Sequence, residues 1–232
     1  QRHGHQDVRE GIQPALHRGL DGFCRAHQVG DVTSHGLGPG RRLGRRNGLG
    51  RLLGRLLGSA NARRVHQGQS FWSELVGKQA FSKALTIVDD PLIVRGLGSS
   101  LYDREGISAR RLPIVENGVV QNLYVDTYYG RKAGMQPTTG SASNRVVGIG
   151  EHSRDELLAE VGEGVYITSW LGGNADNTTG DFSLGLRGHM IEDGQIGRPV
   201  GEMNVTGNLR DLFSRLELVG NDVYPYSTTL SP

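Results

Sequence analysis

Two dipeptides, Asn117-Gly118 and Asp193-Gly194, limit the folds open to this chain more than any other feature of its 232 residues. Each lies between two apolar runs; for the first these are residues 112–115 and 119–125. Asn, Asp and Gly accept the positive φ angles of a two-residue hairpin turn, so each dipeptide predicts a pair of antiparallel strands. Two hairpins favour an α+β fold rich in antiparallel sheet over a doubly wound parallel sheet.

Other local patterns predict further elements around these hairpins. Ser153 and Glu156 have the spacing of a capping box, which predicts the start of a helix. Pro91 ends an apolar run, and we expect a strand over residues 85–91. Helices are expected over residues 70–81, 124–133, 154–161 and 208–218.

Charge divides the chain into two unlike parts. Residues 1–66 hold 12 Arg, no Lys and four acids, whereas residues 67–232 hold 14 Lys and Arg against 20 acids. The overall balance of +2 therefore joins a basic segment of +8 to an acidic segment of −6. The acidic part is long enough for one hydrophobic core, and its charge speaks against nucleic acid as its natural partner.

A leucine-rich segment over residues 48–58 leads into the acidic part. Its leucines recur at the spacing of one helix face, and two arginines fall on the other face. We expect this helix to pack its leucines against the following domain, so we place the domain at residues 48–232. The residues concerned are Leu49, Leu52, Leu53, Leu56 and Leu57, opposite Arg51 and Arg55.

Residues 1–47 alternate Gly, Arg and His with no sustained helix or strand period, and we expect poor order there. Two origins remain open. Arg without Lys is what a GC-rich gene yields when it is read in the wrong frame or from too early a start. The alternative is a basic arm that neutralises nucleic-acid phosphates, which would make the chain a nucleic-acid- or gyrase-associated binding protein.

Several classes of function find no support in the residues. Cys24 is the only cysteine, so there is no internal disulfide and no paired-thiol zinc or redox motif. His66, His152 and His189 are isolated from one another, and no HExxH or HExxxH pattern occurs. No apolar run approaches the roughly 18–20 residues that span a bilayer, so we expect a cytoplasmic protein without membrane contact.

The loop over residues 174–183 is the most unusual stretch, because short polar side chains and glycines crowd the entry to a strand. Its backbone N–H groups and hydroxyls could hold the main chain or the carboxylate of an extended peptide. They could equally form Asx and ST turns that order only the loop itself. Asn177, Thr178, Thr179 and Asp181 are the candidate peptide-binding residues.

An ordered series of motifs from residue 70 onward resembles the C-terminal half of the TldD/PmbA proteins, a cytoplasmic metallopeptidase family once named modulators of DNA gyrase. The motifs are Ser70-Phe71, Gly77-Lys78-Gln79, Gly98-Ser99-Ser100, Tyr102-Asp103, Glu105-Gly106, Glu116-Asn117-Gly118, Tyr128-Tyr129-Gly130-Arg131, Thr179-Gly180-Asp181-Phe182-Ser183, Ile191-Glu192-Asp193-Gly194, Pro199-Val200, Gly207-Asn208-Leu209 and Gly220-Asn221-Asp222. Residues 52–58 resemble the family's preceding helix.

The resemblance implies a role without catalytic residues in this chain. In the family, the catalytic type of subunit holds zinc through a HExxxH helix and a sulfur ligand near the C-terminus, and this chain has neither. Residues 180–188 and 205–212 resemble the PmbA type, also called TldE, which pairs with a TldD-type subunit. The resemblance therefore implies that this chain binds no metal, and that zinc is held by a TldD-type partner in a heterodimer, unless the chain self-associates.

By resemblance, such a pair hydrolyses unfolded or short peptides inside a closed chamber, as in the maturation of peptide precursors. This chain would supply chamber wall and dimer interface, with peptide contacts at residues 177–181. The absence of the family's N-terminal half, and the end of the chain at Pro232, lead us to expect a C-terminally truncated piece of such a subunit.

Overall fold

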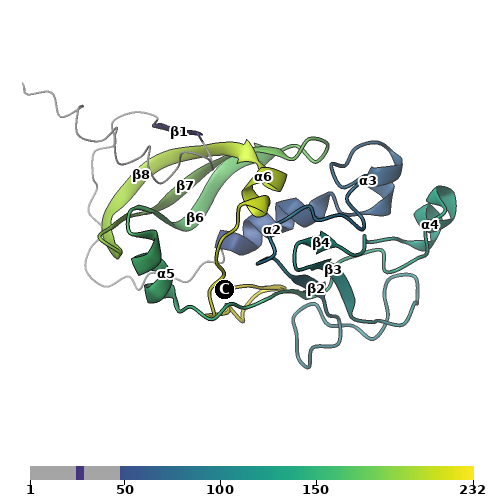
Figure 1. The fold of residues 1–232 in the computed structure, drawn as a ribbon. Helices are drawn as coiled ribbons and strands as arrows, with labels where there is room; N and C mark the ends of the chain where they lie inside the picture. Colours follow the sequence, from purple (N-terminus) through teal and green to yellow (C-terminus); the bar gives the residue numbers. More distant parts are fainter. Residues whose placement is uncertain (1–24, 29–47) are drawn as a thin grey trace, which may run out of the picture.

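A computed structural model describes residues 25–28 and 48–232 of the chain, which form two β-sheets with helix α2 between them (Figure 1). One sheet has the strand order β1-β8-β7-β6, and the other has the order β4-β3-β2-β5-β9. All neighbouring strands are antiparallel except β5 and β9. The predicted α+β class with antiparallel-rich sheet is confirmed.

The element bounds are as follows. The strands are β1 (Arg25–Gln28), β2 (Ile87–Asp89), β3 (Leu112–Glu116), β4 (Val119–Val120), β5 (Arg145–Val147), β6 (Gly164–Ala175), β7 (Asp181–Glu192), β8 (Gln195–Asn208) and β9 (Thr229–Leu230). The helices are α2 (Gly48–Gly58), α3 (Ala62–His66), α4 (Thr127–Ala133), α5 (Arg154–Val161) and α6 (Leu209–Ser214).

Both predicted hairpins are present. Asn117 and Gly118 have φ angles of 47° and 78° between β3 and β4, and Asp193 and Gly194 have 50° and 74° between β7 and β8. Positive φ at both central residues is the feature for which Asn-Gly and Asp-Gly are selected. The second hairpin is the longer of the two, because β7 and β8 pair as far as Asp181 and Asn208.

The prediction that α2 packs onto the domain is confirmed. Its four central leucines are at most 8% exposed, and they lie in the main hydrophobic cluster. The opposite face also contacts the domain: the Arg51 guanidinium donates to the Trp170 carbonyl at 2.8 Å and that of Arg55 to the Gly173 carbonyl at 3.1 Å. Since β6 is the outer strand of its sheet, these arginines satisfy carbonyls that would otherwise stay unpaired at the edge.

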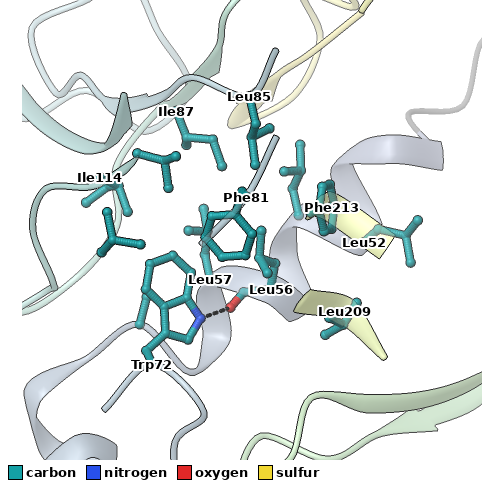
Figure 2. Close-up of a cluster of buried hydrophobic side chains, with 14 of the residues drawn as sticks. Leu52, Leu56, Leu57, Trp72, Phe81, Leu85, Ile87, Ile114, Leu209 and Phe213 are labelled. Atoms are coloured by element: carbon teal, nitrogen blue, oxygen red, sulfur yellow. Dashed lines mark hydrogen bonds between the residues drawn. The ribbon is translucent and has the colours of Figure 1, made fainter. Parts of the chain in front are cut away.

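The core around α2 draws on both sheets and on the segments between them. Figure 2 shows the part formed by α2, α6, β2, β3 and residues 72–85. Trp72 is fully buried, and its indole N–H donates to the Leu56 carbonyl at 3.0 Å. Leu56 belongs to the last turn of α2, where carbonyls have no partner within the helix. Trp72 also packs on Phe81, with the ring centroids 5.5 Å apart, so one side chain closes the helix end and fills the core.

The expected helix over residues 70–81 is wrong, because the segment forms turns. Gly77 has a φ of +79°, and its N–H donates to the Val120 carbonyl at 2.8 Å, while the Val120 N–H donates to the Lys78 carbonyl at 3.1 Å. The backbone groups that a helix would need are thus paired with β4. Val76, in the middle of this segment, is 49% exposed.

Four other expected boundaries need correction. The strand expected over residues 85–91 is β2, which spans only Ile87–Asp89. The strand after the first hairpin ends at Val120 and does not continue to Val125. Helix α4 begins at Thr127, after the N-cap Asp126, whose carboxylate accepts the Tyr129 N–H at 2.6 Å. Helix α6 ends at Ser214, four residues before the expected end at 218. The predicted helix over 154–161 is confirmed with its capping box.

Strands β1 and β6 were not expected. β6 carries bulges at its pairing with β7, one of them near its Gly172-Gly173 pair, and these break the alternation by which a strand is recognised. β1 lies within the segment that was expected to be poorly ordered, and it pairs with β8. The rest of residues 1–47, and the predictions made for it, lie outside the described residues. Among the described helices, none is long and apolar enough to cross a bilayer.

Candidate functional site

The loop that joins β6 to β7 brings together the four candidate residues Asn177, Thr178, Thr179 and Asp181. The loop lies at the tip of the hairpin formed by β6 and β7, on the side of α3 (Figure 1). The two strands remain paired up to the loop, which fixes where its ends lie.

Asp176 orders this loop from its first residue. Its Oδ1 accepts the backbone N–H of Thr178 at 2.6 Å and of Thr179 at 3.4 Å, and its carbonyl accepts the Gly180 N–H at 2.9 Å. This is an Asx turn, in which a short carboxylate replaces a backbone acceptor. The N–H groups of Thr178 and Thr179 are therefore used inside the loop.

Asp181 closes the loop at its other end. Its carboxylate accepts the Asn208 side-chain amide and the Thr179 hydroxyl, each at 2.8 Å. These bonds favour the charged form, so the Asn208 amide, and after it the Thr179 hydroxyl, hold the pKa of Asp181 below its ordinary value. Asn208 also donates to the Thr179 carbonyl at 2.9 Å. Asp181 and Thr179 thus act within the turn.

Asn177 fastens the loop to the corner between α2 and α3. Its Oδ1 accepts the Ser59 hydroxyl at 3.0 Å, and its carbonyl accepts the Phe71 N–H at 3.2 Å. A polar contact to fully buried Ser59 fixes the distance between the hairpin tip and the helices. Three of the four candidate residues therefore shape the loop, as the turn interpretation predicted.

A polar hollow of about 480 Å³ lies between this loop and α3. Thr178 faces it with a hydroxyl for which the described residues offer no hydrogen-bond partner. The hollow is lined by Arg64, Gln69, Asn174, Ala175, Asp176, Asn177 and Thr178. Sequence reasoning did not single out Arg64 and Gln69, because more than 100 residues separate them from the loop. The adjacent pair Arg63-Arg64, near the start of the domain, was the available signal.

A separate cavity of about 430 Å³ lies between residues 91–112 and 138–143. Its inner wall includes Asp89, which is 1% exposed and accepts the Tyr124 hydroxyl at 2.9 Å, the Ser143 N–H at 2.9 Å and the Ser143 hydroxyl. Burial, and then the charge of Asp89, raise the pKa of Tyr124. Because this carboxylate is already saturated with donors, its evident role is to hold the cavity wall together.

Asp103, which lines this cavity, and nearby Glu105 have structural roles. Asp103 accepts the N–H groups of Glu105 and Ile107 at 2.9 and 3.0 Å. Glu105 accepts the Thr127 N–H at 2.9 Å and its hydroxyl at 2.6 Å, at the start of α4. Asp103 therefore orders the 98–112 loop from within, and Glu105 ties that loop to α4.

The donor set of the described residues does not fit a zinc ion. Nowhere in residues 25–28 and 48–232 do three His, Cys, Asp or Glu side chains group as a metal site requires. Helix α2 carries Leu, Gly and Arg, which offer no zinc ligand. His152 lies in a bridge to Gly220 and His189 lies in β7, in separate parts of the fold.

Residues 45–232 match the family model of the PmbA/TldA metallopeptidase C-terminal domain. The chain belongs to the PmbA/TldD family. A relative named metalloprotease PmbA, from Escherichia coli O157:H7, is 34% identical over 162 residues, which are 68% of this chain and 36% of that protein. A relative in Saccharolobus solfataricus, named as a zinc metalloprotease TldD homolog, is 28% identical over 164 residues, or 64% and 37% of the two chains.

The fold agrees with that of solved PmbA/TldD-type proteins. A crystal structure of a proposed modulator of DNA gyrase from Bacteroides thetaiotaomicron superposes with a TM-score of 0.76 at 37% identity, covering 79% of this chain and 42% of that one. The predicted resemblance is confirmed. The chain spans little more than a third of the length of these curated relatives. One relative is named as a zinc metalloprotease, whereas the described residues of this chain contain no group of side chains that could bind zinc.

Proposed function

We propose that this chain is part of a PmbA-type, or TldE-type, subunit that acts with a zinc-bearing TldD-type subunit to hydrolyse short or unfolded peptides. One observation carries the proposal. The domain has the family fold and sequence, yet α2 and its surroundings offer no set of zinc ligands among the described residues. The proposal therefore assigns the zinc and its chemistry to a second, TldD-type subunit, as the family resemblance implies.

In the proposed pair, the partner's zinc would polarise the scissile carbonyl and activate a water molecule. This chain contributes chamber wall, dimer interface and peptide contacts. Asn177, Thr179 and Asp181 would act by fixing the shape of the β6–β7 loop, since their polar groups are bonded within the protein. Thr178 is the member of the set whose hydroxyl would meet a peptide.

The proposal also covers the cellular location, the domain boundary and the partner subunit. We propose a cytoplasmic protein whose family domain begins near residue 48, with a TldD-type subunit as the preferred partner over a second copy of the chain. The alternative function, a nucleic-acid- or gyrase-associated protein with a basic arm, depends on residues 1–47. Of these the structure describes 25–28 alone, so the alternative stays a prediction.

Co-expression with a TldD-type subunit of the same organism tests the proposal. We expect the two chains to co-purify, zinc to follow the TldD-type subunit, and cleavage of an unstructured reporter peptide to require that subunit. A matched control replaces the glutamate of the partner's HExxxH motif by glutamine, which should keep the complex and abolish cleavage. Stoichiometric zinc on this chain purified alone, or peptidase activity without the partner, refutes the division of labour.

A gel-shift titration with salt separates the alternative. DNA binding that weakens with rising salt and disappears on deletion of residues 1–47 would favour the basic arm. Equal binding with and without those residues would contradict it.

A further inference from the structure

Arg64 stands between two polar hollows at the start of α3. It lines the hollow beside the β6–β7 loop and a second one of about 420 Å³, which is formed by α3 and the residues on either side of it. Its backbone N–H is fixed by the N-cap Asn61 at 3.0 Å. The helix start therefore holds the position of Arg64, whatever its side chain contacts.

The Arg64 guanidinium has no acidic partner among the described residues, although the residue is half-buried. Asp176 is the acid that lines the same hollow, and it turns Oδ1 toward the N–H groups of its own loop. No ion pair joins the two side chains in the described part of the protein. A planar cation with five donors is thus held in a hollow without its usual counter-ion.

Most of the other side chains around Arg64 can both donate and accept hydrogen bonds. Gln69 and Asn174 present side-chain amides, and Thr178 presents a hydroxyl, with no hydrogen bond from these groups to the described residues. The acceptor Oδ1 of Asn177 is already bonded to Ser59. A cation without an ion pair among the described residues, with amide and hydroxyl donors beside it, can bind a small planar anion. The Asp176 carboxylate in the same lining keeps its charge and would weaken such binding, although its Oδ1 is bonded within the loop.

We propose that this hollow binds the C-terminal carboxylate of a peptide, with Arg64 as the bidentate partner and Thr178 and Gln69 as additional donors. A carboxylate matches the fork of a guanidinium in shape and charge. We assign the carboxylate to a peptide because the proposed function is peptide hydrolysis. The inference rests on that proposed function for the source of the carboxylate. The site would select peptides by their free end, independently of the sequence that precedes it.

The experiment measures binding to the full 232-residue chain alone, with no partner and no cleavage. The probe is a fluorescent eight-residue unstructured peptide without acidic side chains, made once with a free C-terminal carboxylate and once as the C-terminal amide. We expect the free acid to bind on the order of tenfold more tightly, the effect of one charge-assisted hydrogen-bonded pair. Arg64→Gln should bring the two affinities together.

Two variants serve as controls. Arg131→Gln removes an equally charged, exposed side chain on α4 and should leave the acid-to-amide ratio unchanged. Arg64→Lys keeps the charge but loses the fork, and should retain only part of the preference. Gln and Lys are both good helix formers, and unchanged circular dichroism and thermal unfolding of each variant would show that the fold as a whole is retained.

A third peptide, with an internal Glu and an amidated end, separates a side-chain carboxylate from a terminal one. Preference for the free end over internal Glu supports the proposal, and equal binding of the two overturns the assignment to the C-terminus. Equal binding of the free acid and the amide to the unaltered chain, no measurable binding of the free acid, or an unchanged ratio in Arg64→Gln overturns the site itself. None of these results depends on zinc or cleavage, so a failure here is distinct from a failure of the proposed peptidase pairing.

Discussion

Two indole N–H groups hold the two ends of α2, and they should contribute unequally to stability. Trp72 donates to the Leu56 carbonyl at 3.0 Å, and Trp170 donates to the Gly48 carbonyl at 2.8 Å. Gly48 is the first residue of the helix, where its carbonyl accepts the N–H four residues on. Leu56 lies in the last turn, and the Ala60 N–H that would have reached it donates to Leu57 instead.

Trp72→Phe should therefore cost more than Trp170→Phe. Removing the Trp72 donor leaves a buried carbonyl without a partner, which costs about 1–3 kcal/mol. The smaller ring also leaves a cavity next to Phe81. A cavity of the size of a methyl group or slightly larger lowers the stability by about 1 kcal/mol. We expect a loss of about 2–4 kcal/mol in the free energy of unfolding, against about 1–2 kcal/mol for Trp170→Phe, where the carbonyl keeps its helix bond.

Urea and thermal unfolding followed by far-ultraviolet circular dichroism measure this difference without relying on tryptophan fluorescence. At about 2–4 °C per kcal/mol for a domain of this size, Trp72→Phe should lower Tm by roughly 5–15 °C. Phe is chosen because it keeps most of the ring packing on Phe81. A Trp170→Phe loss equal to or larger than the Trp72→Phe loss would refute the argument that the orphan carbonyl sets the cost.

Gly118→Ala and Gly106→Ala form a second matched pair, since their φ angles are +78° and +79°. At Gly118 a Cβ would lie 2.3 Å from the Phe81 carbonyl oxygen, whereas at Gly106 nothing lies within 4 Å. We therefore expect the free energy of unfolding, measured in urea, to fall by about 1 kcal/mol for Gly106→Ala and by at least about 3 kcal/mol for Gly118→Ala. Similar losses in the two variants would contradict the close-approach argument. A third prediction concerns pH. The Asn208 amide lowers the pKa of Asp181, so the ionised Asp181 stabilises the folded protein above its unfolded-state pKa of about 4. This stabilisation is lost as the pH falls through the lower pKa of the folded state. Asn208→Ala should raise the Asp181 pKa in a carboxyl NMR titration and should flatten the pH dependence of stability below about pH 4; an unmoved midpoint would show that another group sets this pKa.

The fold class and several elements could be predicted because the deciding interactions are local. The two hairpin turns follow from residues that accept positive φ, and α5 follows from the Ser153–Glu156 capping box. The leucine spacing of α2 predicts a buried face without any knowledge of what covers it. Sequence reasoning also found the β6–β7 loop, since its composition is typical of Asx turns.

Tertiary contacts decided the rest. Residues 70–81 form turns and not a helix because their backbone groups bond to Val120, a partner more than 40 residues away. The bulged strand β6 is held by pairing with β7 and by two arginines of α2, and neither contact leaves a pattern in β6 itself. Arg64 and the β6–β7 loop line one hollow, and Asn177 fastens that loop to Ser59 beside α3.

The sequence by itself thus determined the turns, the caps, the buried helix face and the family, because each depends on residues close together in the chain or on their order along it. Only the tertiary structure decided which of the loop's polar groups are already bonded and which remain to meet a ligand. Hydrogen bonds between distant segments use up donors and acceptors one by one, and no local pattern records which ones are left.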